Sequence, residues 1–276
     1  MKYQTFNRSC AYAGLANMLL DYSIDVEDRD IVLGANIPYM FSYDNHEGRY
    51  ISGSMLQGKR WFDLYLNRLG FEFVEEYLDI ESAIRYLGAT KERSMIGLKI
   101  GNTGRHACVF LGVKEGMYFF LNNKYKETEE REEYAFVKNE LYNLMEDSSP
   151  IGHISAVERK RHVDYCAEMK KSLDMLEQYR EEISSFVSVK RTGDELIISK
   201  QTLFESLFLD IVSMLGIIGE KELLNKIIDL RGKYLDALQQ RTELALKECL
   251  PVNDINSVID MYKNIIKKKM AQVTSI

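Results

Sequence analysis

Residues 106–122 read HACVFLGVKEGMYFFLN, and this stretch carries the clearest fold signal in the chain. Two apolar runs flank the segment KEG at 114–116, which is typical of a tight turn between antiparallel strands. The pattern therefore predicts a β-hairpin in which His106 begins the first strand and Asn122 ends the second. Because paired strands of a hairpin run antiparallel, we expect these two ends to lie side by side.

A cysteine, Cys10, stands at the start of an apolar helical pattern earlier in the chain. Ser9 is a favourable N-cap residue, and apolar residues recur at helical spacing over 15–22. The sequence thus predicts a buried helix that begins at Cys10. Unpaired N–H groups and the helix dipole favour a thiolate at such a position, so Cys10 is a candidate nucleophile.

The remaining patterns predict an α+β first half and an all-α second half. Residues 1–147 combine the helix at Cys10 with an antiparallel sheet, whereas residues 155–276 carry apolar stripes at helical spacing. The polar, proline- and glycine-containing segment 146–154 is the expected linker. Further predicted elements are helices over 54–69 and 79–87 and strands over 71–74 and 94–100.

Composition narrows the function classes. The 276 residues are 46% hydrophobic with a net charge of -6, and neither half is basic, so no nucleic-acid partner is expected. No signal peptide and no apolar run of about 18 residues is visible, which predicts a cytoplasmic protein without a membrane span. The four cysteines and four histidines lack zinc-site spacing, so neither a metal nor a cofactor is expected.

Four polar residues together fit nucleophilic catalysis by cysteine. Cys10 would attack, and His106 would take and return the proton. Asn122 would hold the imidazole in the useful tautomer, although the adjacent Asn123 could exchange roles with it. Gln4 precedes Cys10 by six residues, and its amide together with the Cys10 N–H would stabilise an oxyanion.

The order Gln4, Cys10, His106, Asn122 resembles the papain-like superfamily, especially its short bacterial branch that includes the peptidases attached to bacteriocin exporters. The resemblance covers residues 1–147 and implies a papain-like fold with Gln4 in the oxyanion hole. Exporter peptidases carry Asp where this chain has Asn122, and Asp-Cys-Gly where it has Ser-Cys-Ala. The catalytic frame is therefore present without the peptidase sub-signatures.

The whole layout, a short papain-like half followed by a helical half, resembles cysteine acyltransferases and amidotransferases of antibiotic biosynthesis, of the butirosin and closthioamide types. This resemblance implies transfer of an acyl group from a carrier-protein thioester, through a Cys10 acyl-enzyme, to a small amine. An acyl or peptidyl carrier protein is then the expected partner. Two alternatives stay open: a cytoplasmic papain-like peptidase or amidase, and a non-catalytic binding module.

Overall fold

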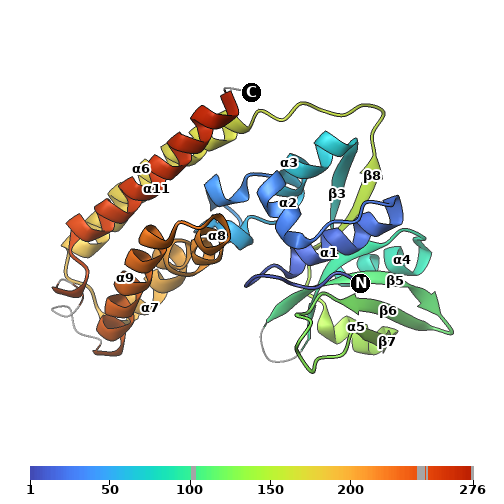
Figure 1. Cartoon of the computed structure of the whole chain (residues 1–276). Coiled ribbons are helices and arrows are strands. Elements are labelled where there is room, and N and C mark those ends of the chain that lie inside the picture. Colours follow the sequence, from blue (N-terminus) through green and yellow to red (C-terminus); the bar gives the residue numbers. More distant parts are fainter. Residues whose placement is uncertain (101–103, 241–245, 247, 275–276) are drawn as a thin grey trace. The chain divides into compact units, whose positions relative to one another are not determined.

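The chain folds into two compact units that do not follow the two halves of the sequence. The computed structural model describes residues 1–100, 104–240, 246 and 248–274. The α+β unit comprises residues 1–35 and 57–163, and the helical unit comprises residues 36–56 and 164–276. A segment of the first half, residues 36–56, therefore belongs with the C-terminal helices (Figure 1).

The α+β unit is built on a six-stranded antiparallel sheet with the order β3-β8-β4-β5-β6-β7. The predicted hairpin is present as β5 and β6, with Glu115 and Gly116 at positive φ in the turn. The predicted α+β class is thus confirmed. The strands are β3 (Phe71–Leu78), β4 (Ser94–Lys99), β5 (Arg105–Lys114), β6 (Met117–Asn122), β7 (Glu133–Val137) and β8 (Ser149–Ala156).

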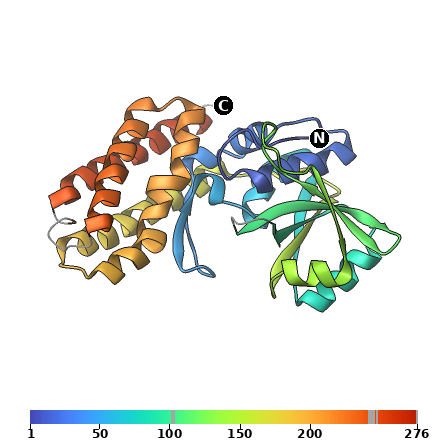
Figure 2. The same cartoon turned by 90° about the horizontal axis from the view of Figure 1, so that it is seen from below.

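Helices cover both faces of this sheet, as Figure 2 shows. The predicted helix α1 (Cys10–Leu19) packs on one face so closely that a Cβ on Gly14 would lie 2.6 Å from the Asn123 side chain. On the other face α4 (Ile80–Ala89) and α5 (Lys138–Leu144) enclose a core with β4, β5 and β6. The unit also contains α2 (Asp28–Gly34) and α3 (Lys59–Leu69).

The predicted linker over 146–154 is wrong, because most of it forms strand β8 between β3 and β4. Ile151 and Ile154 are buried there. Gly152 lets Phe73 lie across the strand, since a Cβ would approach the Phe73 ring to 2.1 Å. A glycine and a proline indicated a loop, but here the glycine serves close packing. The chain passes to the helical unit at residues 163–164 instead.

The helical unit is mostly helix, as predicted, and α6 (Tyr165–Ser188) lies beside α11 (Val252–Thr274) in Figure 1. Within the described ranges no helix by itself has the length and apolar character to span a membrane, though the bent pair Gly193–Phe204 and Ser206–Ile218 passes both criteria jointly. The other helices in the described part of this unit are the 3-10 helices Ile37–Tyr39 and Gly53–Met55, α7 (Gly193–Ser199), the π-helical segments Lys200–Phe204 and Ser206–Asp210, α8 (Ile211–Ile218) and α9 (Lys221–Gln240).

A short hairpin that the sequence did not reveal, β1 (Phe41–Asp44) and β2 (Arg49–Ser52), is anchored among these helices. The Ser52 hydroxyl donates to the Ser206 carbonyl at 2.6 Å. Ser206 lies in a π-helical segment, where the regular α-helical hydrogen-bond pattern is interrupted. Its carbonyl can therefore accept a hydrogen bond from a residue outside the helix. Arg49 is buried beside Glu205 and Asp210, so the hairpin is part of the core of this unit.

Candidate active site

Cys10 is the first residue of α1, and its sulfur faces backbone N–H groups. The Ser9 hydroxyl donates to Asp28 at 2.5 Å and makes no side-chain cap, so it does not occupy the first N–H groups of the helix. Burial raises the pKa of the Cys10 thiol, while hydrogen bonds from the backbone of Ala107 and Ala11 oppose that rise. The pKa lowering expected at a helix start is thus outweighed, and the resting thiol needs a base.

His106 and Gln4 are in direct contact. The Gln4 amide nitrogen donates to the Asn123 carbonyl at 2.7 Å and lies 3.3 Å from His106 Nε2. A carbonyl only accepts, so the amide orientation is fixed and Nε2 of the ring must be the acceptor. Burial lowers the pKa of His106, and the Glu130 carboxylate acts in the opposite direction. His106 is therefore a neutral base with its hydrogen on Nδ1.

A buried carboxylate, Asp28, holds both Gln4 and Cys10 in place through their neighbours. Asp28 accepts from the Thr5 backbone at 2.8 Å, the Thr5 hydroxyl at 2.5 Å and the Ser9 hydroxyl at 2.5 Å. Thr5 follows Gln4, and Ser9 precedes Cys10. Nothing in the sequence singles out Asp28, since an acidic residue at a helix start is ordinary and only the fold brings Thr5 and Ser9 to it.

Asn122 lies opposite Cys108, two residues along the strand from the expected position opposite His106. Lys114 pairs with Met117 at the turn. A bulge between Phe110 and Gly112 shifts the register, so Cys108 pairs with Asn122. Because side chains alternate, His106 and Cys108 share one face, so Asn122 is a diagonal neighbour of His106 on that face. No hydrogen bond joins Asn122 to His106 among the described residues, and His106 Nδ1 is buried without a partner.

The adjacent Asn123 occupies the opposite face and is fully buried. Its amide nitrogen donates to the Ala107 carbonyl at 2.9 Å, and its side-chain oxygen accepts from Asn17 of α1 at 3.1 Å. Asn123 therefore joins α1 to the sheet. The interpretation in which Asn123 replaces Asn122 beside His106 is not supported by these contacts.

The Gln4 amide contacts the His106 ring, and the Cys10 sulfur lies on the backbone of Ala107, the next residue in β5. A thiol and a base in one partly buried place suit nucleophilic attack on an acyl carbon. Gln4 and the N–H groups of the first turn of α1 are donors for the oxyanion that such attack creates. Among the described residues, no cluster of three or more His, Cys, Asp or Glu side chains is arranged to hold a metal ion.

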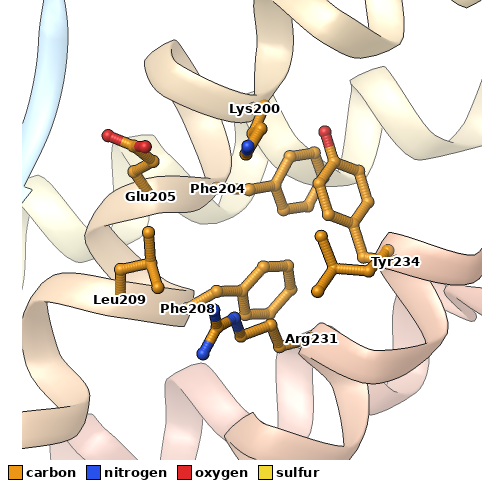
Figure 3. A pocket seen from close by; sticks show the side chains of 8 residues that line it. Lys200, Phe204, Glu205, Phe208, Leu209, Arg231 and Tyr234 are labelled. Carbon is orange, nitrogen blue, oxygen red and sulfur yellow. The ribbon is translucent and has the colours of Figure 1, made fainter. Parts of the chain in front are cut away.

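A pocket of about 90 Å³, partly open to solvent, lies in the helical unit (Figure 3). Aromatic rings and two cationic side chains surround it, and none of the four candidate site residues takes part. It therefore gives no information about the surroundings of Cys10. The lining residues are Lys200, Phe204, Glu205, Phe208, Leu209, Arg231, Tyr234 and Leu235.

Comparison with known proteins gives a likeness to solved structures. No family model and no curated protein matches the sequence. The structure is similar to the peptidase domain of Streptococcus ComA, described as a bifunctional ABC transporter involved in a quorum-sensing pathway, at 12% identity and a TM-score of 0.41. The match covers 56% of this chain and 96% of that one. A likeness at this level carries no argument about activity.

Proposed function

We propose that this protein is a cysteine acyltransferase with a papain-like catalytic centre, which forms an amide from a carrier-protein thioester and an amine. The observation that carries the proposal is the placement of Cys10 at the start of α1 with its sulfur on the Ala107 backbone, one residue from His106, whose ring contacts Gln4. These contacts support a proposal in which Cys10, His106 and Gln4 act together.

The reaction follows from the protonation states of the resting site. His106 takes the Cys10 proton, and the thiolate forms a bond to the thioester carbonyl carbon. Collapse of the tetrahedral adduct breaks the donor carbon–sulfur bond, and the leaving thiolate takes the proton from His106. The amine then attacks the acyl-enzyme, His106 removes its proton, and the Cys10 sulfur leaves with that proton to give the amide.

Gln4 couples proton transfer to oxyanion binding in this scheme. In the resting site one amide hydrogen of Gln4 points to His106 Nε2, which accepts it. Protonation of that ring nitrogen turns it into a donor, so it can no longer accept. The Gln4 N–H is then free for the oxyanion at the moment the negative charge develops, which is when a donor contributes most.

Intact-mass measurement with small acyl thioesters tests the proposal. The protein is incubated with an aromatic or a β-amino acyl thioester, with and without a small diamine. We expect an acyl adduct on the wild type and on Cys166→Ala, no adduct on Cys10→Ala, and clearance by the diamine with formation of amide. Clearance by water at the same rate would instead indicate a peptidase or amidase. Absence of any adduct would contradict both and favour a binding module.

A further inference from the structure

We propose that Glu130 is a positioning residue that acts through Asn122 on His106, which rests on the proposed role of His106 as the base. Glu130 follows β6 in the connection to β7, and its carboxylate lies 3.4 Å from the Asn122 side-chain nitrogen. The sequence patterns gave no reason to single it out, because it stands in an exposed acidic run over 127–133.

The hydrogen-bond partners of Asn122 and His106 define how the two side chains are connected in this proposal. The Asn122 amide nitrogen donates to the Arg131 carbonyl at 2.9 Å, which fixes the amide orientation and leaves Oδ1 as the acceptor end. His106 carries its hydrogen on Nδ1, since Gln4 occupies Nε2. That Nδ1 donor is buried without a partner, and a buried unpaired donor is costly. Asn122 Oδ1, on the diagonal neighbour of the same face, is the acceptor that suits it.

The Glu130 carboxylate polarises the connection from Asn122 to His106. An amide whose N–H donates to a carboxylate has a more negative oxygen, so Asn122 becomes a stronger acceptor for the His106 N–H. The negative charge also favours the imidazolium that forms when Cys10 loses its proton. Burial raises the pKa values of the other groups that interact within this cluster, so they carry no charge at pH 7; they are Cys10, Cys108, Tyr125 and Tyr134. The Arg131 guanidinium, which acts on Tyr134, is a charged group of the same cluster.

Alkylation of Cys10 by iodoacetamide measures the effect without any acyl donor. Glu130→Gln keeps an acceptor for the Asn122 N–H but removes the charge, and Glu129→Gln is the matched control. We expect Glu130→Gln to slow Cys10 alkylation at pH 7 by about three- to tenfold and to move the profile to higher pH. Glu130→Asp should recover most of the rate, and about 1 M salt should shrink the difference. Glu129→Gln should stay within about twofold of the wild type, since it does not contact Asn122.

Three outcomes would overturn the inference: no change in Glu130→Gln, an equal change in Glu129→Gln, or a change that salt leaves intact. His106→Ala separates this failure from failure of the proposed catalytic pair. If His106→Ala slows alkylation and Glu130→Gln does not, Glu130 alone is excluded. If His106→Ala has no effect, the pair itself is wrong and both proposals fall. Trp61 fluorescence checks that each variant is folded.

Discussion

Replacing Asp28 by alanine tests how the site is assembled. Asp28 is fully buried in α2 and accepts four hydrogen bonds, from the Thr5 N–H, the Thr5 hydroxyl, the Ser9 hydroxyl and the Arg29 N–H. Asp28→Ala removes all four acceptor contacts at once. The segment that carries Gln4 and leads into Cys10 then loses its hydrogen bonds to Asp28.

The magnitude follows from those contacts. At about 1 kcal/mol for each lost bond, with an added penalty for donors left buried, Asp28→Ala should lower the free energy of unfolding by about 3–5 kcal/mol. Each carboxylate oxygen of Asp28 accepts two of the four hydrogen bonds. Asp28→Asn should therefore cost about half as much, because the amide nitrogen that replaces one oxygen cannot accept a hydrogen bond. The exposed Asp30, which caps the same helix, provides the control: Asp30→Ala should cost about 1 kcal/mol.

Urea unfolding followed by the fluorescence of Trp61, the single tryptophan, is the appropriate assay. Trp61 is buried in α3, in the same unit as Asp28, so the signal reports the unit that is perturbed. Acyl-adduct formation on Cys10 should also slow by about 10- to 100-fold in Asp28→Ala, because the reacting groups lose their fixed placement. The reasoning is refuted if Asp28→Ala costs no more than Asp30→Ala, or if it is destabilised while the adduct forms at the wild-type rate.

Three further predictions concern the helical unit and the dependence on pH. Gly53→Ala should destabilise the helical unit by about 3 kcal/mol, since φ is +51° there and a Cβ would lie 2.1 Å from the Asp210 carbonyl. Gly216→Ala is the control and should be neutral or stabilising, because a Cβ there meets open space. Thermal unfolding followed by circular dichroism measures both variants. Because burial lowers the pKa of His106, the unfolded chain binds more protons, so stability should fall as pH drops below about 6.5. His106→Gln should flatten that slope in urea unfolding, and an unchanged slope would exclude His106 as its cause. Because burial raises the pKa of Cys10, its alkylation rate should still be climbing above pH 9, and a plateau below that pH would show the thiol is not shielded.

The candidate site was predictable in part. Spacing and turn chemistry selected Gln4, Cys10 and His106; Gln4 contacts His106, and the Cys10 sulfur lies on the backbone of Ala107. The position of Asn122 was only approximate, because the sequence showed where the hairpin turns but not the bulge between Phe110 and Gly112 that shifts the register. Asp28 and Glu130 could not be found, since their significance depends on partners brought to them by the fold.

By itself the sequence determined some of the local elements. The hairpin of β5 and β6, the start of α1 at Cys10 and the end of α3 at Gly70 follow from apolar periodicity and from glycine at positive φ, which are properties of neighbouring residues. The C-terminal helices were equally visible, because their apolar stripes recur at the helical period.

Only the tertiary structure decided how these elements are shared between the two units. Strand β8 is a strand because β3 and β4 supply its hydrogen-bond partners, and residues 36–56 join the helical unit because Ser52 and Arg49 find their polar partners there. The physical reason is common to both. A strand and a buried polar group are stabilised by groups far away in the chain, and no local pattern records which distant groups those will be.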